Sequence, residues 1–174
     1  MRAFWSKKNT GGMLEAGAAA PDFTLNDVDG KPHSLAEALR SGPVLAAFFK
    51  ISCPVCQFTF PFIERIFERY GGGKAQIWGI SQDDARDTKD FYKEFDLSFP
   101  ALPDGDCYPV SNLYRITNVP SLFLIEPDGK ISISVTGFSK KDLDDIAKRF
   151  AATSANPVIP LFAPSDIVPD YKPG

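Results

Sequence analysis

Two cysteines separated by two residues, Cys53 and Cys56, are the strongest chemical signal in this sequence. They stand between an apolar run at 44–50, which predicts a buried strand, and a segment at 55–70 with helical spacing of apolar residues. Cys53 is therefore expected just ahead of a helix N-terminus, where free backbone N–H groups and the helix dipole favour a thiolate. Cys56 is expected one turn into the helix, on the same side and less exposed. The pair predicts a redox dithiol in which Cys53 attacks a disulfide and Cys56 resolves the product.

Two other interpretations of this pair need to be weighed. Cysteines at this spacing can be small buried side chains without chemistry, or half of a zinc site. A zinc site needs a second ligand pair, and the chain has one histidine, His33, and one further cysteine, Cys107. The acidic pairs Asp83-Asp84 and Asp104/Asp106 are interpreted as cap and loop residues. We therefore favour the redox interpretation and expect no metal and no other cofactor.

Cys107 follows an Asp-Gly-Asp turn, and the sequence predicts that it opens a helix over 107–114. One interpretation makes Cys107 a third redox cysteine that resolves an oxidised Cys56. We favour the simpler alternative, a small residue at a helix start in a reducing cell.

Composition limits the class of protein. The chain has 174 residues, 44% of them apolar, which predicts one domain with a packed core. A net charge of −3 argues against a nucleic-acid partner. No stretch approaches the ~20 apolar residues of a membrane span, and residues 1–8 lack the apolar core of a signal peptide. We expect no membrane span and a cytoplasmic location, where a Cys-x-x-Cys pair is more often catalytic than structural.

Periodicity and turn residues predict an α/β fold. Hairpins are expected around Asp29-Gly30 and around 127–129. Between them, strands alternate with helices, which implies a central mixed sheet flanked by helices. Ser139 and Asp142 resemble a capping box that opens a last helix.

Composition also divides the chain into three segments. We expect an N-terminal arm at 1–18, a folded domain at 19–153 and a Pro-rich tail at 154–174. The tail has five prolines among apolar residues, so it cannot be helical, yet it is too apolar for a flexible linker. It is expected to lie across the body or across a neighbouring subunit, which leaves a homodimer open.

These patterns resemble the thioredoxin-like superfamily over about residues 20–151. More narrowly, they resemble the redoxin branch of alkyl hydroperoxide reductase/thiol-specific antioxidant (AhpC/TSA) proteins and thioredoxin-like thiol–disulfide reductases. Ala20-Pro21-Asp22-Phe23-Thr24-Leu25, the Cys-x-x-Cys pair with Pro61, Asn118-Val119-Pro120-Ser121 and the hairpin at 127–131 carry the resemblance. It implies a thioredoxin-like fold with an extra N-terminal hairpin, and thiol–disulfide oxidoreductase activity.

The resemblance also implies a substrate-binding loop. A cis bond before Pro120 would turn the backbone of Val119 towards the dithiol, where its N–H and C=O pair with an extended substrate segment. The implied partners are protein or small-molecule disulfides and dithiols, and a cellular thiol reductant such as thioredoxin or glutathione.

Two alternatives remain. Peroxiredoxins of this branch carry a Pro-x-x-x-Thr-x-x-Cys motif whose cysteine aligns with Cys56. Here the threonine position is Cys53, the proline position is Phe49, and the peroxiredoxin arginine would align near Pro120. A peroxidase with Cys56 as the peroxidatic cysteine is therefore the weaker prediction. The alternative from another class is a non-catalytic thioredoxin-fold module that binds a client chain.

The chain also departs from ordinary thioredoxins. The tryptophan that usually precedes the first cysteine is Ser52, the buried acid is Ala47, and the glutamate of some thioredoxin-like reductases is Thr59. The proton acceptor for Cys56 is thus unassigned, with Thr59, Lys50 or a water as candidates.

Overall fold

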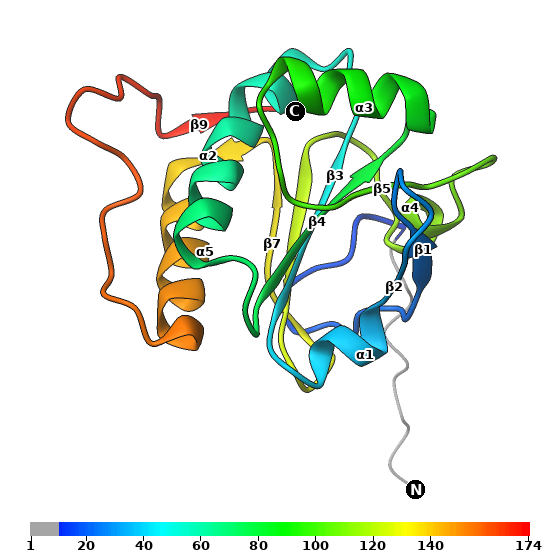
Figure 1. Cartoon of the computed structure of the whole chain (residues 1–174), viewed down its shortest axis with the longest axis horizontal. Coiled ribbons are helices and arrows are strands. Elements are labelled where there is room, and N and C mark those ends of the chain that lie inside the picture. The colour runs from blue at the N-terminus through cyan, green and yellow to red at the C-terminus, as the bar shows by residue number, and fades with distance from the viewer. Residues whose placement is uncertain (1–10) are drawn as a thin grey trace, which may run out of the picture.

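The computed structural model describes residues 11–174, so the expected arm at 1–18 lies within the described part only from Gly11 onward. A five-stranded sheet forms the centre of the molecule (Figure 1). Its strands, in order across the sheet, are β5 (Ala101–Pro103), β4 (Gln76–Ser81), β3 (Val44–Phe49), β6 (Ser121–Ile125) and β7 (Ile131–Thr136). The first three are parallel, whereas β6 runs antiparallel to β3 and β7 antiparallel to β6. The predicted mixed sheet is confirmed.

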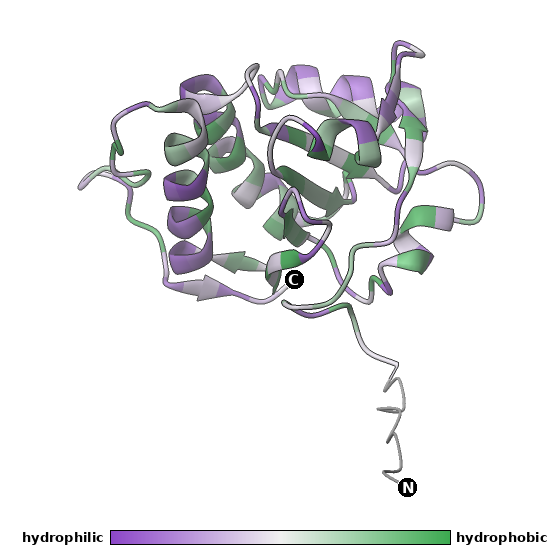
Figure 2. Ribbon diagram, turned by 90° about the horizontal axis from the view of Figure 1, so that it is seen from below, coloured by the Kyte–Doolittle hydropathy of each residue, from purple (hydrophilic) through white to green (hydrophobic). Residues whose placement is uncertain are grey.

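Every residue of β3 is buried, because helices cover both faces of the sheet. Odd-numbered side chains of β3, such as Phe49, enter one apolar cluster, and even-numbered ones, such as Phe48, enter the other. The helices divide between the faces: α2 (Pro54–Tyr70), α3 (Ala85–Glu94) and α5 (Lys140–Ser154) on the first, α1 (Leu35–Leu39) and α4 (Pro109–Leu113) on the second. Figure 2 shows the matching hydropathy, with hydrophobic residues in the central strands and many hydrophilic residues along the helices.

Both predicted hairpins are present. β1 (Thr24–Asn26) pairs antiparallel with β2 (Pro32–Ser34), and β6 pairs with β7. The two turns contain Gly30 and Gly129 at φ 87° and 83°, a backbone region that glycine enters without steric cost.

Helix α2 places the dithiol at its start. Cys53 is its N-cap, Pro54 fills its first position, and Gly71 caps its C-terminus. Pro61 lies inside the helix, as expected. In the described part of the chain, no helix combines the length and the apolar character needed to cross a membrane.

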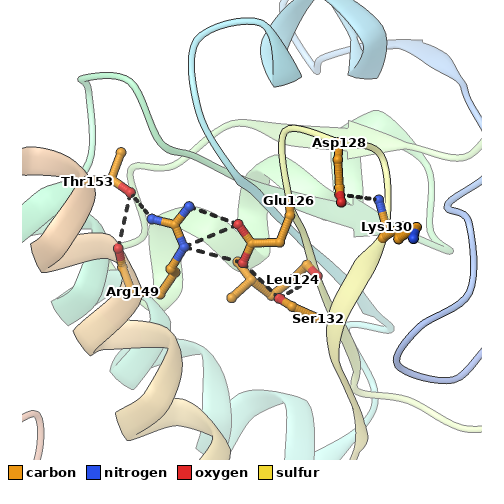
Figure 3. Close-up of polar contacts among 7 residues, drawn as sticks. All are labelled: Leu124, Glu126, Asp128, Lys130, Ser132, Arg149 and Thr153. Atoms are coloured by element: carbon orange, nitrogen blue, oxygen red, sulfur yellow. Dashed lines mark hydrogen bonds and ion pairs between the residues drawn. The ribbon is translucent and has the colours of Figure 1, made fainter.

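Helix α5 begins as predicted, since the Ser139 hydroxyl accepts the backbone N–H of Asp142 at 3.3 Å. The apolar face of the helix is buried in the core, with the side chains of Leu143, Ile146, Ala147 and Phe150. Farther along α5, Arg149 Nη2 and Nε reach Glu126 Oε2 at 2.8 and 3.1 Å (Figure 3). This ion pair links α5 to the turn between β6 and β7.

The C-terminal tail lies across the body of its own chain. Leu161 is fully buried in the cluster that holds α2 and α5. Arg65 of α2 donates to the Leu161 carbonyl at 2.8 Å and to the Asp166 carboxylate at 2.7 Å. The tail then forms β9 (Tyr171–Lys172), which pairs antiparallel with β8 (Phe138–Ser139). This two-stranded sheet was not expected from the sequence.

Candidate active site

Cys53 is the accessible sulfur of the pair. It is half-buried, in extended conformation (φ −85°, ψ 115°), and the next residue, Pro54, is exposed. The backbone N–H of Cys56 donates to Cys53 Sγ at 3.2 Å, and the Cys53 thiol donates to the Val119 carbonyl at 3.4 Å. Of these two contacts, only the one from the Cys56 N–H can persist once the thiol has lost its proton. The first sulfur therefore lies at the N-terminus of α2 with a backbone N–H directed at it.

Cys56 lies beneath it, with none of its surface exposed. Burial raises the pKa of the Cys56 thiol far above its ordinary value, and the contact with Cys53 and the charge of Asp83 raise it further. A backbone hydrogen bond from Lys50 acts in the opposite direction. Cys56 is thus a protonated thiol at neutral pH, and it must lose its proton before it can attack.

The bond between Val119 and Pro120 is cis, as the resemblance implies. The loop is held by the Ser121 hydroxyl, which donates to the Asn118 carbonyl at 2.6 Å, and by the Gly137 N–H, which donates to the Pro120 carbonyl at 2.7 Å. In this loop the carbonyl of Val119 is therefore directed at the sulfur of Cys53.

Thr59 and Lys50, the two residues considered as proton acceptors for Cys56, lie in different environments. Thr59 is fully buried, and its hydroxyl donates to the Val55 carbonyl at 2.6 Å, so its proton is engaged within the helix. Lys50 is exposed, and its influence on Cys56 comes from its backbone. Neither arrangement gives Cys56 a side-chain base.

Sequence reasoning missed Asp83, which it interpreted as a cap or loop residue. Its neighbour Asp84 is indeed the N-cap of α3. The Asp83 carboxylate instead accepts the backbone N–H of Ile51 at 2.8 Å, and its charge acts on Cys56. A signal existed: Asp83 follows β4 and the dithiol follows β3, and parallel neighbours end at the same edge of a sheet.

The prediction for Cys107 was partly wrong. The expected helix over 107–114 is reduced to α4, which starts at Pro109 with Tyr108 as its N-cap. Cys107 and Tyr108 have φ values of 64° and 50°, so Cys107 lies outside the helix, exposed in the preceding turn. The cause is Pro109, which disfavours helical conformation in the residue before it. Asp104 is a loop residue, as expected, and its carboxylate accepts the first-turn N–H groups of Val110 at 2.9 Å and Ser111 at 2.7 Å.

Beside the dithiol lies a hollow of about 290 Å³ with an acidic edge. It is lined by Ile51, Ser52, Gln57, Asp87, Asp90, Phe91 and Glu94. Among residues 11–174, no three His, Cys, Asp or Glu side chains are grouped as metal ligands. The reactive groups of this site are the sulfurs of Cys53 and Cys56.

Comparison with known proteins agrees with this geometry. The model of the AhpC/TSA family matches residues 16–134. The thiol-disulfide oxidoreductase ResA of Oceanobacillus iheyensis is 30% identical over 150 residues, covering 80% of this chain and 77% of that protein. ResA of Geobacillus thermodenitrificans is 28% identical over 130 residues, 74% of each chain.

Solved structures give the same result. The thioredoxin domain of a thiol-disulfide oxidoreductase from Bacteroides vulgatus superposes with a TM-score of 0.68 at 25% identity, covering 79% of this chain and 98% of that one. The thioredoxin-like fold is thereby confirmed, and the non-catalytic module loses its support. A dithiol at a helix start beside a cis proline, in a chain with such relatives, leads to one conclusion: the chain belongs to the AhpC/TSA family and is a thiol–disulfide oxidoreductase.

Proposed function

We propose that Cys53 attacks the substrate disulfide and that Cys56 resolves the mixed disulfide. The observation that supports these roles is the difference in burial, since Cys53 is half-buried at the N-cap of α2 and Cys56 is fully buried below it. A disulfide arriving from solvent meets the first sulfur before the second.

The reaction proceeds in two displacements. The Cys53 thiolate bonds to one substrate sulfur, and the other substrate sulfur leaves as a thiolate that takes a proton from solvent. Cys56 then gives up its proton, bonds to Cys53 Sγ and displaces the remaining substrate thiolate. The substrate disulfide gains two electrons and the dithiol becomes a 53–56 disulfide; the reverse sequence oxidises a substrate dithiol.

The backbone of Val119, with Pro120 behind it, holds the substrate segment next to Cys53. Its carbonyl is already within 3.4 Å of the attacking sulfur, so a chain paired with this loop lies in reach of it. Asp83 is assigned as the acceptor of the Cys56 proton. Asp83 acts on Cys56 electrostatically, and its carboxylate is joined to the backbone just before the dithiol.

The finer partner assignments follow from the same chemistry. Thioredoxin or glutathione regenerates the dithiol by attacking Cys53 of the 53–56 disulfide. The homodimer left open by the sequence, and the cytoplasmic location, stay predictions. Light scattering of the purified chain and fractionation of the producing cells check them.

One experiment tests the proposed function against the peroxidase alternative. The reduced protein and its Cys53→Ser, Cys56→Ser and Cys107→Ser variants are mixed with glutathione disulfide or hydrogen peroxide, and the disulfides are mapped by mass spectrometry. We expect reaction with glutathione disulfide to require Cys53, a stable Cys53 adduct in Cys56→Ser, and no effect of Cys107→Ser. Fast peroxide consumption that survives loss of Cys53 but not of Cys56 would establish a peroxidase instead.

A further inference from the structure

The last residues of the chain reach the dithiol end of the molecule (Figure 1). We call residues 170–174 the strap. The strap is joined to β8, which follows β7, and the last residue of β7, Thr136, pairs with Ser121 directly after the cis proline. The Lys140 N–H donates to the Asp170 carbonyl at 2.9 Å, Phe138 pairs with Lys172, and the Tyr171 hydroxyl donates to the Thr136 carbonyl at 3.1 Å.

The strap also contacts the helix that carries the dithiol. Lys172 Nζ lies 4.6 Å from the ring centre of Phe58, two residues after Cys56. A cation at this distance from an aromatic ring is attracted by the ring electrons. The strap therefore bridges β8 and the first turns of α2.

Its end lies directly against the proposed substrate loop. A Cβ added to Gly174 would be 2.6 Å from the Val119 carbonyl oxygen, so the backbone of Gly174 is packed on that carbonyl. The Asn118 amide also donates to the Gly174 carbonyl at 3.4 Å. The Val119 carbonyl is thus in contact with the strap and with the Cys53 thiol at the same time.

We infer that the strap is a specificity determinant, which favours small-molecule disulfides over disulfides in extended polypeptides. The inference rests on the proposed function of the Val119–Pro120 loop. An extended polypeptide that pairs with this loop runs past Val119 and meets Gly174, so the strap must move first. A small disulfide needs only the accessible part of the half-buried Cys53 and the hollow beside it, which the strap does not line.

The strap is held by contacts that are individually weak. Its pairing with β8 covers two residues on each strand, and Tyr171 is 54% exposed. A short exposed pairing of this kind opens at low free-energy cost. A polypeptide substrate therefore reacts slowly rather than not at all, and its rate reports the cost of opening.

The test compares two symmetric disulfides: glutathione disulfide, and the disulfide dimer of an extended ten-residue peptide with a single cysteine. Because each is symmetric, attack at either sulfur gives the same adduct on Cys53 and the same leaving thiolate. Reduced wild type is compared with a chain ending at Pro169 and with the double variant Tyr171→Ala/Lys172→Ala. Lys74→Ala is the matched control, because Lys74 is exposed and precedes β4, whereas the dithiol follows the parallel neighbour β3 at the other end of the strands. Attack at Cys53 is followed by stopped flow.

We expect removal of the strap to raise the rate with the peptide by about tenfold and the rate with glutathione disulfide by less than about twofold. A peptide rate that stays unchanged or falls, or an equal change for both substrates, would overturn the inference. Absence of reaction between wild type and glutathione disulfide would instead overturn the proposed function.

A second measurement needs no change in the tail, in case the shortened chain fails to fold. In Cys56→Ser the peptide is trapped on Cys53, and hydrogen exchange of the Tyr171 and Lys172 amides is compared with that of the glutathione adduct. Faster exchange in the peptide adduct alone is expected. Equal exchange in the two adducts contradicts the inference.

Discussion

The thiol of Cys53 donates a hydrogen bond to the carbonyl oxygen of Val119 at 3.4 Å, across 66 positions of sequence. This contact joins the first sulfur to the loop that carries the cis proline. It exists only while Cys53 is protonated, because a thiolate has no hydrogen to donate. Ionisation of Cys53 therefore removes this contact, and the Val119 carbonyl keeps only its contact with Gly174 as the sulfur becomes reactive.

The difference in burial between the two sulfurs predicts a difference in alkylation. At pH 7.5, iodoacetamide should modify Cys53 in the Cys56→Ser variant at least about tenfold faster than it modifies Cys56 in Cys53→Ser, because only the thiolate reacts. Both variants carry Cys107→Ala, which removes the exposed third thiol. Comparable rates, followed by mass spectrometry, would contradict the proposed roles.

The raised pKa of Cys56 predicts a loss of stability at alkaline pH. Above about pH 8.5 the thiol of Cys56 ionises in the unfolded state but keeps its proton in the folded state. Ionisation therefore stabilises the unfolded state relative to the folded one. Each further pH unit should lower the free energy of unfolding by about 1.4 kcal/mol through this group. Urea titrations of Cys53→Ser and Cys53→Ser/Cys56→Ala at pH 7.5 and 9.5 isolate the effect. An equal fall in the free energy of unfolding for the two variants would contradict this role of Cys56.

Asp83 should control the second displacement. In Asp83→Asn the amide oxygen still accepts the Ile51 N–H, but the negative charge is gone, so the pKa of Cys56 falls and a proton acceptor is lost. Glutathione release from the Cys53 adduct should be slower at pH 7, and its rise with pH should begin at lower pH. Asp84→Asn, which alters only the cap of α3, is the control. An unchanged pH profile in stopped flow would exclude this role.

Leu161 should anchor the tail. Its side chain is fully buried, so Leu161→Ala should lower the free energy of unfolding by about 3 kcal/mol. Ile159, two residues earlier and 50% exposed, gives a matched control in which alanine changes stability little. Urea midpoints that are equal for the two variants would show that the tail does not contribute to the core.

The ion pair between Arg149 and Glu126 should matter for stability and not for chemistry. Both side chains are partly exposed, so water screens the pair, and a double-mutant cycle of Arg149→Ala and Glu126→Gln should give a coupling of about 0.5–1 kcal/mol. The rate with glutathione disulfide should stay at the wild-type value. A coupling near zero would mean that the α5 contact is made by apolar packing alone.

Much of this fold follows from local signals in the sequence. The cysteines at the start of α2, both hairpin turns and the capping of α5 by Ser139 each depend on a few neighbouring residues. These signals were sufficient to place Cys53 and Cys56 at different depths. The cis bond before Pro120 came from family resemblance and not from local chemistry.

What escaped prediction depends on contacts between distant segments. Asp83 is a loop acid by local pattern, and only the pairing of β3 with β4 brings it to the dithiol. The two-residue strand β9 is too short to give a periodic pattern, and its partner lies more than thirty residues earlier. Cys107 lies outside α4 for a local reason, because Pro109 starts the helix and disfavours helical conformation in the residue before it.

The position of Gly174 has a practical consequence for work with this protein. Any residues fused after Gly174, such as an affinity tag or a fluorescent partner, would begin next to the carbonyl of Val119. The added chain would then start beside Cys53, with which that carbonyl is in contact. Kinetic constants measured on such fusions with polypeptide substrates would describe a dithiol whose approach route has been altered by the label.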